Sequence, residues 1–232
     1  MRQLLIAIAP RVAALTVGLS AFLLFWLQLF TAKSLLPLVG GTPAVWNTCQ
    51  CFFQVSLVLG YAYADRVSRP SQGRVTGGPI GPVQSLWQRW TRVWPRRWQL
   101  GPIGRQAIVL AVPLIVLPVG FPQPDATAID RPILWLLATL ASAVGLPFLA
   151  LATTGPLVQA WLGRSLANHP YWLYGASNAG SLLGVLGYPL EIEPWLSVRS
   201  QAQLWQGAYL LTAGLVLFCA IASQENVKPV IA

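Results

Sequence analysis

The stretch HPYWLYGASNAGSLLGVLGYPLEIEPWL, from His169 to Leu196, decides the fold class. Its middle, Tyr171 to Leu190, carries no charge and is long enough to cross a bilayer as a helix. Polar side chains recur in it at helical spacing and therefore share one side: Tyr174, Ser177, Asn178, Ser181 and Tyr188. Ala176, Gly180 and Gly184 repeat every fourth residue, a spacing that lets another helix approach closely in lipid. Such a span belongs inside a helical bundle.

The composition is that of an integral membrane protein. Of 232 residues, 55% are hydrophobic and 9% are charged, whereas about a quarter of a soluble domain is charged. The chain has three cysteines without a CxxC pair and a single histidine, so we expect neither a metal site nor a cofactor. It also has no phosphate-binding glycine loop and no GxSxG serine. We therefore expect that it is not an enzyme.

Six hydrophobic stretches are predicted to be transmembrane helices. They cover residues 12–31, 45–64, 105–121, 133–162, 171–190 and 206–223. The fourth exceeds the bilayer thickness, and Pro147 and Thr153–Pro156 are expected to kink or break it. Either the break lies beside a binding cavity, or the helix is merely kinked and its inner end lies in the membrane interface.

The distribution of positive charge predicts the topology. With the N-terminus in the cytoplasm, inner segments hold twelve of the fifteen lysines and arginines and outer segments hold three. The positive-inside rule therefore predicts that both termini are cytoplasmic, as in a protein of the bacterial inner membrane. The net charge of +9 is explained by this topology and by attraction to anionic lipids, so no nucleic-acid partner is expected.

The cytoplasmic loop, residues 67–104, separates helices 1–2 (residues 1–66) from helices 3–6 (residues 105–223), and residues 224–232 form a cytoplasmic tail. Within it, residues 83–98 are predicted to form an interfacial amphipathic helix. One face of this helix carries tryptophans and the other carries arginines: Trp87, Trp90, Trp94 and Trp98, against Arg89, Arg92 and Arg96. The surface fits anionic lipid headgroups and a partner protein equally well.

The second hydrophobic stretch also has a polar face. Its members are spaced by three, four and seven residues: Asn47, Gln50, Gln54 and Tyr61. Together with Asn178 and Ser181, this face either lines a cavity for a small polar molecule or provides hydrogen bonds between helices. Glu191 and Glu193 follow the fifth stretch, where they either attract a cation to the mouth of such a cavity or are solvated loop residues.

Several segments together resemble the membrane domain of fused major-facilitator/spermidine-synthase proteins. They are LLPLVGGTPAVWNTC (Leu35–Cys49), FFQ (Phe52–Gln54), LGYAYADR (Leu59–Arg66), PFLALATTGPLVQAWL (Pro147–Leu162), the stretch quoted first, and SQAQLW (Ser200–Trp205). The resemblance implies an all-α bundle of six transmembrane helices, like one half of a major-facilitator transporter. In fused members a catalytic synthase domain follows. This sequence ends at Ala232 without that domain's glycine-rich loop, so we do not expect the enzymatic label to apply.

Three functions follow from these features. The first is a non-catalytic subunit that scaffolds or anchors a partner in a larger membrane complex. The second is a transporter or binding module for a small polar or cationic solute, such as a polyamine, acting as a homodimer. The third is the membrane half of a two-chain spermidine-synthase-like enzyme. In each case the expected partner is another membrane subunit or a second copy of this chain.

Overall fold

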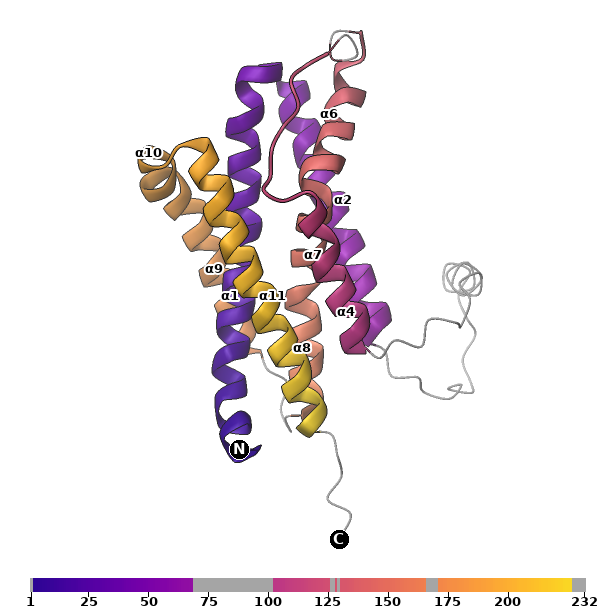
Figure 1. Ribbon diagram of the computed structural model, residues 1–232, viewed down its shortest axis with the longest axis vertical. Helices are drawn as coiled ribbons and strands as arrows, with labels where there is room; N and C mark the ends of the chain where they lie inside the picture. The colour runs from indigo at the N-terminus through magenta and orange to yellow at the C-terminus, as the bar shows by residue number, and fades with distance from the viewer. Residues whose placement is uncertain (1, 69–101, 126–127, 129, 166–170, 227–232) are drawn as a thin grey trace, which may run out of the picture.

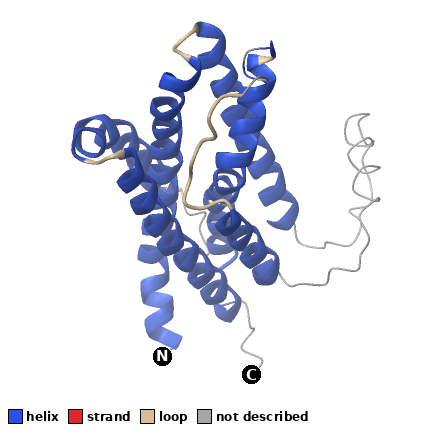
Figure 2. Cartoon of the chain, turned by 45° about the horizontal axis from the view of Figure 1, so that its top comes forward, coloured by secondary structure: helices blue, strands red, loops and turns tan. Residues whose placement is uncertain are grey.

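The computed structural model describes residues 2–68, 102–125, 128, 130–165 and 171–226, and every regular element within them is a helix (Figures 1 and 2). The all-α class predicted from the sequence is therefore confirmed for these residues. The predicted interfacial helix, residues 83–98, lies outside them. The beginning of α1 and the end of α11 lie at the same end of the bundle (Figure 1).

The first two helices are joined by a short turn whose residues have side chains suited to ending one helix and starting the next. α1 (Arg2–Val39) ends where Gly40 adopts φ 75°, and the Gly40 amide donates to the Leu36 carbonyl at 3.0 Å. Glycine favours this left-handed conformation because it has no Cβ. α2 (Pro43–Ser68) then begins with proline in its first turn, and the Thr42 hydroxyl accepts from the Val45 amide at 3.4 Å.

The third predicted helix is wrong in its C-terminal part. It was expected to reach Phe121, but α4 (Pro102–Ala111) gives way to the 3₁₀ helix η1 (Val112–Ile115), and the chain then leaves helical structure. Pro113 has no N–H to donate, and a second proline follows at position 118. The described non-helical chain, residues 116–125, runs along the bundle (Figures 1 and 2), and the Phe121 ring lies 6.2 Å from that of Phe30.

The fourth predicted helix is interrupted at both of the expected places. α6 (Pro132–Leu140) passes into the π-helix η2 (Ala141–Gly145) just before Pro147, and then into α7 (Leu146–Ala152). A turn at Thr153 precedes α8 (Thr154–Ser165). Side chains compensate for the break: Gln106 Nε2 donates to Thr153 Oγ1 at 3.0 Å, and this hydroxyl donates to the Ala150 carbonyl at 2.8 Å. Gln106 and Thr153 are both buried at the break, and Thr153 also lines a pocket of about 330 Å³ between α2, α4 and α7.

The last part of the chain forms a helical hairpin. α9 (Trp172–Gly187) continues into the π-helix η3 (Tyr188–Ile192) at Pro189, and then into the short α10 (Glu193–Trp195). Leu196 is extended, and α11 (Val198–Asn226) follows. The hairpin returns the chain along α1 (Figure 1).

Helix α1 is the centre of the packing. It contacts α9 and α11 along much of its length and also contacts α7 and α8, whereas α2 packs mainly on α6, α7 and α8. Buried α1 side chains such as Leu23 and Leu27 meet Phe148, Trp205 and Tyr209 in one continuous core.

Three helical stretches in the described residues are long and apolar enough to cross a membrane: Ile8–Val39, Pro132–Gly163 and Val198–Ser223. They identify the chain as a protein with several candidate membrane spans. The other predicted spans fall short for different reasons. α2 is 26 residues long but carries the polar row, and α9 has only 16 residues before Tyr188 starts the π-helix.

Candidate functional site

A groove of about 460 Å³ lies where the last turns of α1, the first turns of α2 and η3 come together. Its charged members are Lys33 and Glu193, and most of its remaining wall is apolar. Its lining residues are Leu29, Ala32, Lys33, Leu35, Leu36, Gly40, Gly41, Thr42, Val45, Trp46, Cys49, Tyr188, Pro189 and Glu193. The volume is in the range of small-molecule sites in proteins.

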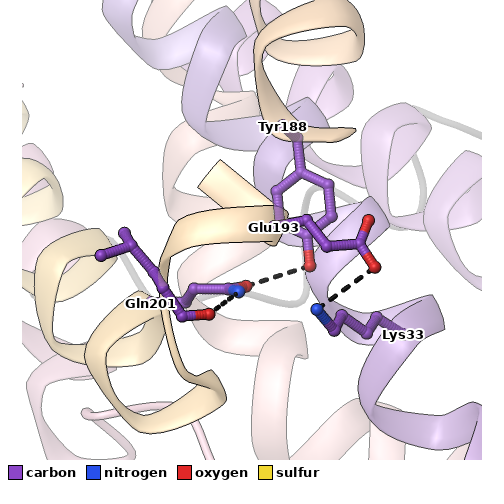
Figure 3. A network of polar contacts seen from close by, with 5 residues as sticks. Lys33, Tyr188, Glu193 and Gln201 are labelled. Atoms are coloured by element: carbon purple, nitrogen blue, oxygen red, sulfur yellow. Dashed lines mark hydrogen bonds and ion pairs between the residues drawn. The ribbon is translucent and has the colours of Figure 1, made fainter. Parts of the chain in front are cut away.

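An ion pair crosses this groove. Lys33 Nζ lies 3.2 Å from Glu193 Oε1, and the two side chains are 31% and 40% exposed (Figure 3). Lys33 comes from α1 and Glu193 from α10, so the pair connects two distant parts of the sequence. At this exposure the pair itself contributes about 0–1 kcal/mol to stability. The ion pair therefore matters less for stability than for binding, because it places a positive and a negative group in one largely apolar groove.

Buried hydrogen bonds fix the segment that carries Glu193. Tyr188 is 2% exposed, and its hydroxyl donates to Gln201 Oε1 at 3.0 Å (Figure 3). Gln201 Nε2 in turn donates to the Leu196 carbonyl at 2.8 Å. Because Leu196 is the extended residue between α10 and α11, this network holds the corner of the hairpin. Glu193 is thereby held over the groove on a short, well-anchored segment.

The GxxxG pair brings α9 against α1. A Cβ on Gly180 would overlap the Gly18 carbonyl oxygen, and a Cβ on Gly184 would lie 2.8 Å from the Phe22 carbonyl oxygen. Real Cβ atoms do not approach backbone oxygens this closely. The two glycines therefore allow backbone-to-backbone contact of the kind their spacing favours in membranes. This contact places α9 beside the middle of α1, at Gly18 and Phe22.

The predicted polar face of α2 lies on the outside of the described chain. Asn47, Gln50, Gln54 and Tyr61 are all exposed. α2 packs on its other side, through buried residues such as Phe53 and Gly60. No part of the described chain encloses these four side chains, so the predicted cavity stays a prediction.

The polar residues of α9 are divided between two environments. Tyr174 and Asn178 are exposed, whereas Ser177 and Ser181 are half-buried. The Ser181 hydroxyl donates to the Ser177 carbonyl at 3.0 Å and so satisfies itself within the helix. The α9 set is not gathered with the α2 set into one enclosed site. The predicted lipid or partner surface of tryptophans and arginines, residues 87–98, lies outside the described residues.

Sequence reasoning missed the pairing of Lys33 with Glu193. Each was assigned to an outer segment, and Glu193 was interpreted as either a cation attractor or a solvated residue. The available signal was the presence of opposite charges at the outer ends of two predicted spans. The buried Gln106–Thr153 hydrogen bond was also missed, although Thr153 belongs to the predicted break.

No metal centre is built by the part of the chain that the structure describes. It contains no group of three or more histidine, cysteine or acidic side chains placed to hold an ion. The cysteines are unpaired thiols: Cys49 and Cys219 are buried, and Cys51 is exposed.

Comparison with known proteins gives no relative from which a family or function can be taken. No family model, no curated protein and no solved structure matches this chain.

Proposed function

We propose that this protein is a non-catalytic membrane subunit, a six-helix half-bundle that pairs with another membrane-protein chain through α2. The observation that carries the proposal is the exposed polar row on α2: Asn47, Gln50, Gln54 and Tyr61. Gln54 lies eleven residues after Pro43, or roughly 16 Å along the helix. In a spanning helix this is near the bilayer centre.

A polar amide at that depth requires a protein partner. Side chains of this type within membranes almost always face other helices or a water-filled cavity, because lipid offers no hydrogen bonds. The described chain leaves Gln50 and Gln54 uncovered, so a second protein surface is the most economical way to satisfy them. Tyr174 and Asn178 on α9 are exposed as well, so a second helix also presents polar side chains to its surroundings.

The pairing surface is tested by replacing both amides. In Gln50→Leu/Gln54→Leu, two interhelical hydrogen bonds worth about 0.6 kcal/mol each are lost, so association should weaken roughly sevenfold. The tagged chain is extracted in mild detergent, and the mass of the complex is measured by native mass spectrometry over a dilution series. We expect the variant to dissociate at a correspondingly higher concentration.

Gln203→Leu is the matched control, because Gln203 is also exposed but belongs to α11. This control should associate as the unaltered protein does. The proposal is wrong if the unaltered chain is monomeric and partner-free when gently extracted. It is also wrong if the α2 double variant and the Gln203 variant behave identically.

The alternative function, binding or transport of a small polar or cationic solute, is supported only by the size of the groove. Glu193, the residue that would attract a polyamine-like cation, is already paired with Lys33 at 3.2 Å. A cationic solute would have to displace or face that ammonium group, which makes the groove a poor site for polycations. The same extraction also tests the third alternative, a two-chain enzyme. Recovery of a synthase-like subunit together with this chain would support it.

A further inference from the structure

The groove combines apolar walls with a neutral pair of opposite charges. Leu29 and Leu36 of α1 and Val45 and Trp46 of α2 supply apolar surface, and Lys33 and Glu193 are the charged groups among its lining residues. The ion pair uses one carboxylate oxygen of Glu193. A lysine ammonium has three donors and a carboxylate has two acceptor oxygens, so both groups retain hydrogen-bonding capacity for a ligand.

Because Lys33 and Glu193 together carry no net charge, the groove favours a ligand that also carries no net charge. A singly charged ligand would leave an unbalanced charge against apolar walls, which is costly. A zwitterion avoids that cost, because its anionic group can bind Lys33 while its cationic group binds Glu193. The groove is therefore matched to a molecule that carries both charges a few bonds apart.

The position of the groove favours a lipid over a soluble zwitterion. It lies at the end of a candidate membrane span, Ile8–Val39, beside the turn that joins α1 to α2. Trp46 is 51% exposed there, and indoles are enriched at the depth of lipid headgroups. Leu29 precedes Lys33 by one helical turn, or about 6 Å, and so continues the groove toward the bilayer interior. An acyl chain fits this apolar extension.

We propose that the groove binds a phospholipid whose headgroup joins a phosphate to a primary ammonium, as in phosphatidylethanolamine. Lys33 binds the phosphate and Glu193 accepts hydrogen bonds from the ammonium. A quaternary ammonium has no N–H group to donate, and phosphatidylglycerol has no cation. The expected order of affinity is therefore phosphatidylethanolamine, then phosphatidylcholine, then phosphatidylglycerol. This inference does not rest on the proposed pairing, because its two charged groups, Lys33 and Glu193, are not part of the polar row of α2.

The test compares three lipids with identical acyl chains, each added to delipidated protein in detergent and counted by native mass spectrometry. The unaltered protein should bind phosphatidylethanolamine about tenfold more tightly than phosphatidylglycerol, the effect of one charge-assisted hydrogen-bonded contact. Glu193→Gln should remove this preference, and Lys33→Gln should weaken all three phosphate lipids. Soluble phosphoethanolamine should compete poorly because it lacks acyl chains.

Glu191→Gln and Arg199→Gln are the matched controls, because both side chains are exposed at the same end of the bundle and neither lines the groove. They should keep the preference of the unaltered protein. Equal retention of the three lipids by the unaltered protein overturns the proposal, whatever the variants do. Equal losses in Glu191→Gln and Glu193→Gln also overturn it. Full competition by soluble phosphoethanolamine would assign the groove to a soluble zwitterion instead.

Discussion

Gly180→Leu should unfold or grossly destabilise this protein. Gly180 lies on the face of α9 that touches α1, and even a Cβ there would overlap the Gly18 carbonyl oxygen. Neither backbone can yield without separating the helices, since the obstructing atom belongs to the main chain. Overpacking costs about 1–3 kcal/mol or more, so Gly180→Ala should lose about 2 kcal/mol and the leucine variant should lose more. The free energy of unfolding is measured by titrating detergent-solubilised protein with a denaturing detergent.

Other glycines of α9 provide controls within the same helix. A Cβ on Gly175 would meet no atom of another helix within 4 Å, and a Cβ on Gly187 would meet only the Phe22 ring, at 4.0 Å. Gly175→Ala and Gly187→Ala should therefore change stability by about 0.5 kcal/mol or less. Gly184→Ala should resemble Gly180→Ala, because its Cβ would meet backbone and Cβ atoms of α1 within 3 Å. If alanine costs the same at 175 and 180, the close α1–α9 contact is not present.

The helical class could be predicted from the sequence because each signal for it is local. The turn from Gly40 to Pro43 and the interruptions at Pro147 and Thr153 follow from the properties of the residues themselves. The predicted third helix was too long because hydrophobicity continues through Pro118, whereas the α-helix ends at Ala111 and only a 3₁₀ helix continues through Pro113. Apolar composition indicates that a segment lies in an apolar environment, but it does not show that the segment is an α-helix. Proline, which has no N–H to donate, interrupts the α-helix within such a segment.

The candidate site was harder to predict because it depends on contacts between distant segments. The GxxxG spacing indicates that a helix can approach α9, but nothing in that spacing identifies Gly18 and Phe22 of α1 as the neighbours. The spacing of the polar residues in α2 shows that they share one face of the helix. It does not show which part of this chain or of a partner covers that face. Glu193 meets Lys33 just after the π-helix η3, at the hairpin corner that the Tyr188–Gln201 hydrogen bond holds, and both features depend on contacts between distant residues.

Trp205→Ala should cause the second large loss of stability. Trp205 is 1% exposed and stacks on Tyr209, with ring centroids 5.5 Å apart and planes at 20°. Its Nε1 donates to the Leu23 carbonyl at 3.0 Å, and the Tyr209 hydroxyl donates to the Leu110 carbonyl at 2.8 Å. The pair thereby connects α11 to both α1 and α4. Deleting the indole leaves a cavity among three helices and should cost about 3–5 kcal/mol.

Two variants separate the contributions of Trp205 and control for the loss of a tryptophan. Trp205→Phe keeps an aromatic ring against Tyr209 but has no donor for Leu23, so it should cost less than Trp205→Ala by at least about 1 kcal/mol. Trp195→Ala removes an indole that is 79% exposed and should change stability by about 0.5 kcal/mol or less. The same detergent titration measures all three. Equal costs at 195 and 205 would mean that α11 does not pack on α1 through Trp205, because only a buried indole leaves a cavity when it is removed.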